Sequence, residues 1–154
     1  DEEKAREMIG TLKPEDQVAY SQAALKALIA HPQGNGKAGA MGFCWGGGTV
    51  NNLAVAAPDL LAAVPYYGGQ PNPESVAAIQ AKVMAHYGGL DDRINAGIPE
   101  FEAALKAAGI DHQIFIYEGA NHAFNNDTSA ARYDKAAADL AWSRTVALFK
   151  EELS

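Results

Sequence analysis

The sequence predicts an α/β fold, with a mostly parallel sheet of about four strands and helices on both faces. Two observations predict it. Short apolar segments with strand character lie at residues 37–43, 60–66, 82–87 and 111–117. A segment of helical pattern separates each of them from the next, and this alternation is typical of right-handed crossovers between parallel strands. The 154 residues are enough for one domain and too few for two.

The helices are predicted from hydrophobic periodicity and from residues that begin or end helical turns. In the second helix, Leu25, Leu28 and Ile29 recur near a period of 3.6 residues, and Pro14 suits a first turn. Gly109 ends a later helix, because glycine readily adopts the left-handed conformation found at helix ends. The expected helices cover residues 2–8, 14–30, 49–57, 75–81, 97–108 and 129–152.

Composition and charge exclude several classes of partner. The formal net charge is −7, and a negative field repels nucleic acid and anionic lipid. No apolar run approaches the roughly 18 residues that a membrane span needs. We therefore expect neither a nucleic-acid nor a membrane partner. The expected location is cytoplasmic, although the chain looks truncated at Asp1, which leaves an amino-terminal signal open.

The single cysteine, Cys44, lies in the segment Gly42-Phe43-Cys44-Trp45-Gly46, between an expected strand and an expected helix. This is the pattern of a nucleophile elbow with cysteine in place of serine. We expect glycine at both flanking positions because a larger side chain would collide with the following helix. The helix dipole and a nearby imidazolium would lower the pKa of the thiol. The alternative is an inert, buried cysteine, and one cysteine alone cannot form a disulfide or a zinc finger.

The best candidate for a general base is His122, in the loop that follows the last expected strand. Loops at the carboxyl ends of parallel strands lie on the side where the elbow opens. His86, near the end of the third strand, is the second candidate, whereas His31 and His112 are expected to be structural. All four could also be ordinary surface or core histidines.

An orienting carboxylate is expected between the nucleophile and the base, in the chain order of this type of site. Asp91 lies 91 − 44 = 47 residues after Cys44 and 122 − 91 = 31 residues before His122. The adjacent Asp92 is the alternative candidate for the orienting carboxylate. The alternative for both is a role in capping the helix that follows.

Aromatic residues gather near the carboxyl ends of the expected strands, where they could frame a substrate pocket or pack in the core. They are Trp45, Tyr66, Tyr67, Tyr87 and Phe124.

Three segments together resemble the dienelactone hydrolase (carboxymethylenebutenolidase) family. They are Gly42-Phe43-Cys44-Trp45-Gly46-Gly47, Gly88-x-x-Asp91-x-x-Ile94 and Asn121-His122-Ala123-Phe124. The resemblance implies an α/β-hydrolase that cleaves ester or lactone bonds through an acyl-enzyme, without cofactor or metal. It implies the triad Cys44, Asp91 and His122, with Asp91 chosen over Asp92 by the glycine three residues earlier. It also implies that the Trp45 amide contributes to the oxyanion hole.

The chain departs from the family pattern in two respects. Members specific for dienelactone have an arginine four residues after the histidine, where this chain has Asn126. Arg93 or Arg132 could take its place. The chain also covers about the carboxyl-terminal two thirds of the fold, so residues 1–154 form a single hydrolase domain without the usual amino-terminal strands.

The missing strands raise an alternative function. Strand 37–43 would be left with one unpaired edge, and an apolar edge favours pairing with another chain. We therefore expect a homo-oligomer through this edge. In the alternative reading, the chain is a catalytically weak hydrolase fragment that acts as an assembly module with a missing amino-terminal half or another copy.

Overall fold

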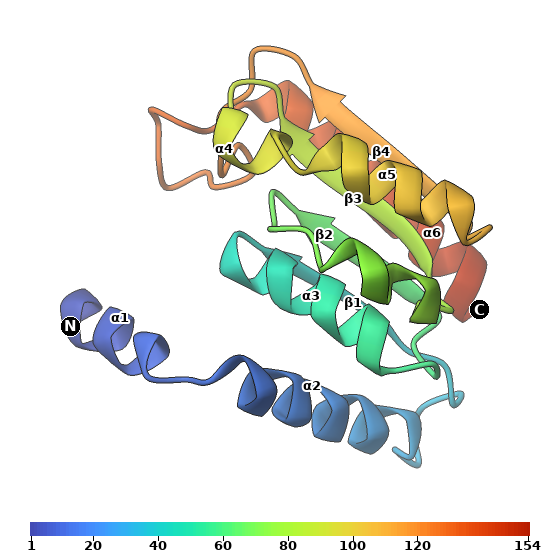
Figure 1. Ribbon diagram of the computed structural model, residues 1–154. Coiled ribbons are helices and arrows are strands. Elements are labelled where there is room, and N and C mark those ends of the chain that lie inside the picture. Colours follow the sequence, from blue (N-terminus) through green and yellow to red (C-terminus); the bar gives the residue numbers. More distant parts are fainter.

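The computed structural model describes the backbone of all 154 residues and every side chain except those of Glu2 and Arg6. Its centre is a parallel sheet in the order β1-β2-β3-β4 (Figure 1). The strands are β1 (Gly39–Phe43), β2 (Ala62–Tyr66), β3 (Lys82–Gly88) and β4 (His112–Tyr117). Sequential order and uniform direction confirm the predicted parallel α/β sheet, and they bring all four carboxyl ends to one edge.

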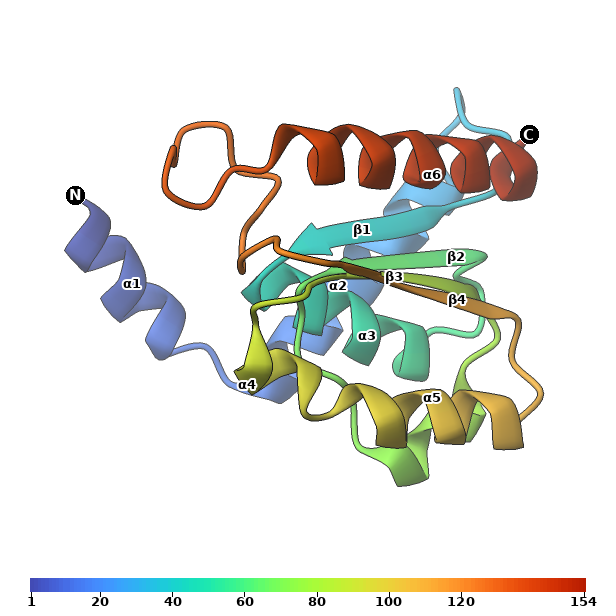
Figure 2. The same ribbon diagram turned by 90° about the horizontal axis from the view of Figure 1, so that it is seen from above.

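Helices cover both faces of the sheet, as predicted. The helix α6 (Lys135–Leu153) lies on one face, and α3 (Trp45–Ala56) and α5 (Ile98–Ala107) lie on the other (Figure 2). The short 3-10 helix η1 (Pro73–Ala78) packs against α3 and α5, while α2 (Pro14–Ile29) packs beside α3. The remaining helices are α1 (Glu2–Gly10) and α4 (Asp92–Asn95). Among the described residues, no helix has the length and hydropathy to cross a bilayer.

The three largest differences from the predicted helices each have a local reason. The helix α3 begins at Trp45 and not at Thr49, so it includes three consecutive glycines that the low helix propensity of glycine would place in a loop. The helix α6 begins only at Lys135, because the side chain of Asp134 caps it by accepting the Ala137 N–H. The four-residue helix α4 was not predicted, since it is too short to show a period.

A buried polar network joins the sheet to α6. His86 is fully buried, its Nδ1 lies 2.9 Å from the Tyr117 hydroxyl, and its Nε2 lies 3.2 Å from Oγ1 of Thr145. The Tyr66 hydroxyl lies 2.7 Å from the same Thr145 oxygen. Burial lowers the pKa of His86 to about 3, with a further contribution from the positive charge of Arg144. His86 is therefore a neutral core residue and not a candidate base.

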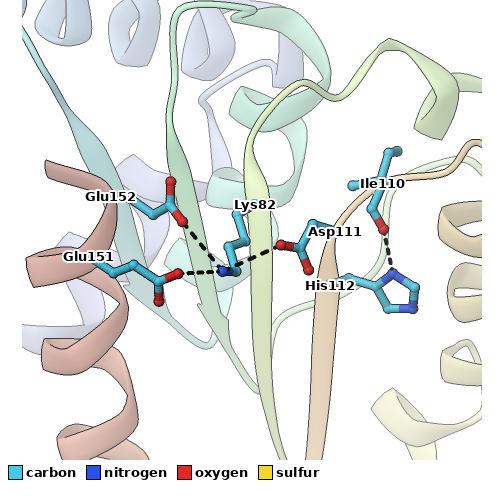
Figure 3. A network of polar contacts seen from close by, with 6 residues as sticks. All are labelled: Lys82, Ile110, Asp111, His112, Glu151 and Glu152. Carbon is cyan, nitrogen blue, oxygen red and sulfur yellow. Dashed lines mark hydrogen bonds and ion pairs between the residues drawn. The ribbon is translucent and has the colours of Figure 1, made fainter.

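A second polar network lies at the amino end of the sheet, away from the elbow (Figure 3). Nζ of Lys82 lies 3.3 Å from a carboxylate oxygen of Asp111, 3.1 Å from Glu151 and 3.4 Å from Glu152. Nδ1 of His112 donates to the Ile110 carbonyl at 2.7 Å. The ion pairs of Lys82 tie the end of α6 to β3 and to the start of β4, whereas the hydrogen bond of His112 is local to the turn before β4.

Candidate functional site

The turn after β1 has the geometry of a nucleophile elbow. Cys44 has φ 54° and ψ −118°, a conformation that side chains rarely adopt. Its N–H donates to the Tyr66 carbonyl at 3.0 Å, and its own carbonyl accepts the N–H groups of Gly47 and Gly48 at 3.0 and 3.2 Å. These bonds hold the residue between β2 and the first turn of α3, so its thiol projects from the carboxyl edge of the sheet.

Close backbone packing explains only part of the glycine pattern. A Cβ on Gly42 would lie 2.3 Å from the Gly46 carbonyl oxygen, so glycine is required there, as predicted. A Cβ on Gly46 would meet nothing within 4 Å, so the expectation for that position is wrong. The tight contacts lie instead at Gly47 in α3 and at Gly68 in the loop after β2. A Cβ on Gly47 would lie 2.7 Å from the Tyr66 carbonyl oxygen, and a Cβ on Gly68 would lie 2.3 Å from the Gly47 carbonyl carbon.

The structure joins Asp91 to His122 across two neighbouring strands. Asp91 follows β3, His122 follows β4, and Nδ1 of His122 donates to Oδ2 of Asp91. Asp91 is buried and stands at the N-cap of α4, yet its side chain makes no capping hydrogen bond there. Asp92 is exposed in the first turn of α4. Of the two carboxylates, only Asp91 is in place to orient the imidazole.

Cys44 and His122 line the same cleft, whose volume is about 520 Å³. Among the described side chains, no hydrogen bond yet joins Sγ to the imidazole. Burial raises the pKa of the Cys44 thiol, while the charge of Arg132 lowers it and that of Asp91 raises it. The net direction is upward, which corrects the expectation of a stabilised thiolate. A thiol whose pKa is raised keeps its proton at neutral pH.

Of the aromatic residues expected at the pocket, Trp45 and Tyr67 line the cleft. Trp45 is half-exposed and begins α3, so its backbone N–H has no helical carbonyl one turn earlier to bond. Tyr66, Tyr87 and Phe124 are fully buried and do not line the cleft. Tyr66 at the end of β2 and Phe124 in the loop after β4 pack in a core cluster with residues of α6, whereas Tyr87 packs with Ile94 and Ile98. The candidate site therefore retains Tyr67 and not the other three.

Two strained residues near the site were not predicted from the sequence. Tyr67 has φ 39° and Ala123 has φ 64°, and neither is a glycine or an asparagine that would signal such a conformation. Tyr67 packs its ring 5.1 Å from the His122 ring. The three residues with positive φ, Cys44, Tyr67 and Ala123, thus lie close to the imidazole of His122, and such clustering is typical of functional sites.

Sequence comparison decides the family. The sequence profile of the dienelactone hydrolase family matches residues 1–153. The chain belongs to the dienelactone hydrolase family. This membership agrees with the predicted resemblance and with the parallel sheet.

Named relatives in the family share about a third or more of their aligned residues with this chain. A protein of Saccharolobus solfataricus, provisionally named a carboxymethylenebutenolidase, is 40% identical over 113 residues, which are 73% of this chain and 43% of the relative. The protein usf of Aquifex pyrophilus is 34% identical over 122 residues, 77% of this chain and 52% of the relative. The chain thus spans about half the length of the curated relatives it matches.

Solved structures of the family share the same architecture. A dienelactone hydrolase-like promiscuous phosphotriesterase from metagenomic libraries superimposes with a TM-score of 0.84 and 25% identity, over 99% of this chain and 67% of that one. A provisionally named dienelactone hydrolase of Klebsiella pneumoniae gives a TM-score of 0.83 and 27% identity, over 92% and 63%. The fold of this family member is therefore the α/β-hydrolase fold of those enzymes over the shared region.

Proposed function

We propose that this chain hydrolyses carboxylic ester or lactone bonds through the triad Cys44, His122 and Asp91 and an acyl-enzyme intermediate. The observation that carries the proposal is the Asp91–His122 hydrogen bond beside a cysteine held at φ 54° in the same cleft. Family membership supports the reaction class. No metal or cofactor enters the proposed reaction.

Acylation begins when Sγ of Cys44 attacks the acyl carbon. The raised pKa of the thiol means that the proton leaves during attack, and His122 accepts it at Nε2, since Nδ1 is bound to Asp91. Asp91 fixes this tautomer and stabilises the imidazolium that forms. The Trp45 N–H, at the start of α3, stabilises the oxyanion of the tetrahedral intermediate.

Collapse of the intermediate breaks the carbon–oxygen bond of the ester. His122 returns its proton to the departing alkoxide, and a thioester remains on Cys44. Water, activated by the same imidazole, then attacks the thioester and releases the acid and the free thiol. Each group is used twice, which is why the orientation of the imidazole matters for both halves of the reaction.

Mass spectrometry combined with a chromogenic short-chain ester tests this mechanism. We expect the wild-type chain to release the chromophore and to carry one acyl group on Cys44 during turnover. Cys44→Ala removes both signals, whereas His122→Ala slows the formation of the adduct. Turnover by Cys44→Ala at the wild-type rate would refute the thiol mechanism.

A second proposal concerns assembly and rests on the position of β1 at the edge of the sheet. Its outer backbone groups have no neighbouring strand among the described residues. Beside it, α2, β1 and α3 enclose a groove of about 360 Å³ with mostly apolar walls, flanked by the exposed side chains of Leu28 and Trp45. We propose that a second copy pairs with this edge in a two-fold dimer. A monomer by light scattering at micromolar concentration would refute this proposal.

A further inference from the structure

Uncharged polar side chains form much of the wall of the cleft that holds Cys44. They are Gln17 of α2, Thr49 and Asn52 of α3, and Gln70 of the loop after β2. Each of them has an oxygen that accepts hydrogen bonds and at least one hydrogen that it can donate. The hydroxyl groups of a sugar or polyol need both kinds of partner, whereas an aliphatic group needs neither. The composition of this wall therefore favours a ligand that is rich in hydroxyl groups.

Hydrogen bonds to the backbone hold the polar groups of this wall in place. Nε2 of Gln70 donates to the Ile94 carbonyl at 3.2 Å, and a Cβ on Gly97 would lie only 2.4 Å from Oε1 of Gln70. The Thr49 hydroxyl donates to the Trp45 carbonyl at 3.1 Å. A primary amide has a second N–H, and a hydroxyl oxygen that donates can still accept. These groups are thus oriented before a ligand binds and keep free positions for it, which lowers the entropic cost of binding.

The ring of Trp45 adds an apolar surface to the same wall. Trp45 lines the cleft and is 51% exposed. Trp45, Gly48, Thr49 and Asn52 stand at positions i, i+3, i+4 and i+7 of α3, so they share one face of the helix. The C–H groups on one face of a pyranose ring can pack on the electron-rich face of an indole, while the hydroxyl groups at its edge reach polar neighbours. An exposed indole beside hydroxyl and amide groups is therefore suited to a sugar ring.

Gly48 leaves space on this helix face that packing does not require. A Cβ at Gly48 would make only ordinary contacts, 3.7 Å from the backbone nitrogen and oxygen of Gly69. Glycine inside a helix is less favourable than alanine, so the helix gives up some stability at this position. Because Gly48 lines the cleft, the missing side chain enlarges the space available to a ligand.

The position of His122 places the alcohol part of an ester in this cleft. A smaller cavity of about 300 Å³ also opens on Cys44, and His122 lines the cleft but not the smaller cavity. Because Asp91 binds Nδ1, the departing oxygen takes its proton from Nε2. The departing alcohol therefore lies in the cleft, among the polar groups, and a short acyl group has room in the smaller cavity.

Charged groups of both signs lie at this end of the cleft. Arg93 lines the cleft, and an adjoining cavity of about 450 Å³ is lined by Arg93 and Arg132 together with Asp91. Besides burial, which raises the pKa of the Cys44 thiol, the charge of Arg132 lowers this pKa and that of Asp91 raises it. A guanidinium donates to hydroxyl oxygens as well as to anions. These charges are therefore compatible with a sugar, and an alcohol that carries an anion is the competing ligand.

We propose that the site selects uncharged sugars or polyols esterified with a short acyl group, and that the sugar ring stacks on Trp45 and bonds its hydroxyls to the polar wall. The proposal rests on the proposed thiol mechanism. In acylation the sulfur–carbon bond forms, the carbon–oxygen bond of the ester breaks, and the thiol proton passes through His122 to the sugar alkoxide. Water then cleaves the thioester, its oxygen stays on the short acid that is released, and the thiol regains its proton.

Three acetates built on a six-membered ring test the proposal with the full chain. Methyl 6-O-acetyl-glucopyranoside carries hydroxyl groups, cyclohexylmethyl acetate carries none, and 4-(acetoxymethyl)cyclohexanecarboxylate carries an anion. Each kcat/KM is divided by the rate constant for hydroxide hydrolysis of the same ester, which removes intrinsic reactivity. We expect the glucoside to exceed each of the other two by about fivefold or more, the effect of about one net hydrogen bond. A glucoside no better than cyclohexylmethyl acetate would overturn the proposal, and so would a carboxylate that matches or exceeds the glucoside.

Asn52→Ala removes one exposed amide from the polar wall. We expect the kcat/KM ratio of the glucoside to cyclohexylmethyl acetate to fall about threefold in this variant. Gln80→Ala is the matched control, because it removes an exposed amide that lines a different cavity, at the amino end of the sheet. An unchanged ratio in Asn52→Ala, or an equal fall in Gln80→Ala, would overturn the proposal.

Protection of Cys44 from alkylation detects the sugar site without turnover. Methyl glucopyranoside at about 0.1 M should slow the reaction of Cys44 with iodoacetamide about twofold or more, and cyclohexanecarboxylate at the same concentration should protect less. Trp45→Ala should abolish the protection by the glucoside. Trp142→Ala should keep it, because Trp142 is equally exposed but lies in α6 and does not line the cleft.

The two measurements separate the sugar site from the hydrolase function. If no ester is hydrolysed, the proposed hydrolase function fails by itself, and the protection of Cys44 still decides the sugar site. Absence of protection in the wild-type chain, or equal protection in Trp45→Ala, overturns that site even in an active enzyme.

Discussion

Replacing Gly42 by alanine should destabilise the chain and displace the nucleophile. The added Cβ would lie 2.3 Å from the Gly46 carbonyl oxygen and 2.5 Å from its carbon, both of them backbone atoms. Ordinary contact begins near 3.4 Å, so β1 and the first turn of α3 must separate by 3.4 − 2.3 = 1.1 Å. No flexible side chain can yield instead. Overpacking of a close contact typically costs about 1–3 kcal/mol, and we expect the upper part of that range.

Gly46→Ala is the matched control in the same turn. Its Cβ would meet nothing within 4 Å, and alanine is a better helix former than glycine. We expect its free energy of unfolding to stay the same or to rise by about 0.5 kcal/mol. The two variants add the same methyl group four residues apart, so a difference between them reports the contact and not the change in composition.

Urea unfolding followed by circular dichroism measures the difference. With a slope of about 1–3 kcal/mol per molar urea, a loss of 3 kcal/mol lowers the midpoint by about 1 M or more. Because Cys44 lies between the two glycines, Gly42→Ala should also slow acylation, whereas Gly46→Ala should not. Equal midpoints for the two variants would refute the argument from close approach, and so would normal acylation in a destabilised Gly42→Ala.

Three further predictions follow from the site and the core. Asp91→Asn should lower the rate of Cys44 acylation by about 100-fold or more, and Asp92→Asn by less than about twofold, because only Asp91 contacts His122; equal losses in stopped-flow acylation would contradict this. Alkylation of Cys44 by iodoacetamide should be slower at pH 7 than alkylation of a small thiol, because burial raises the pKa of Cys44. Its rate constant should still increase with pH where that of the small thiol has levelled off, and a plateau below pH 8 would contradict this. His86 binds a proton more weakly when folded, with a pKa of about 3, than when unfolded, so the free energy of unfolding should fall by about 1.4 kcal/mol between pH 7.5 and pH 5.5, and His86→Gln should flatten that dependence in urea titrations.

Local signals in the sequence predicted the four strands and most of the helices, and they named the candidates for the proposed triad. The apolar segments before Cys44, Asp91 and His122 read as strands, and parallel strands bring their carboxyl ends to one edge. Chain order then named the candidates, and the hydrogen bond between Asp91 and His122 agrees with that choice. The rival Asp92 could be set aside only by resemblance, since the two carboxylates are adjacent in sequence.

Burial could not be read from position in the sequence. Tyr66, Tyr67 and Tyr87 all lie near strand ends, yet only Tyr67 lines the cleft, because Tyr66 packs in the core with residues of α6 and Tyr87 packs with residues of α4 and α5. The same reason explains the thiol: its place at a helix start favours a lower pKa, but the desolvation that raises the pKa comes from residues far along the chain. The two adjacent glycines Gly46 and Gly47 likewise differ in their surroundings: a Cβ on Gly46 would meet nothing within 4 Å, whereas a Cβ on Gly47 would collide with the Tyr66 carbonyl oxygen.

By itself, the sequence determined the α/β class, the largely parallel sheet and the family, and it named Cys44, Asp91 and His122 as candidates for the nucleophile, acid and base, because these depend on local periodicity and on short motifs. Only the tertiary structure decided which carboxylate meets the imidazole, which aromatic rings face the cleft, where close contact demands glycine and how the cavities divide around Cys44. These properties depend on distances between segments that are remote in the chain, and such distances exist only once the sheet and its covering helices have packed.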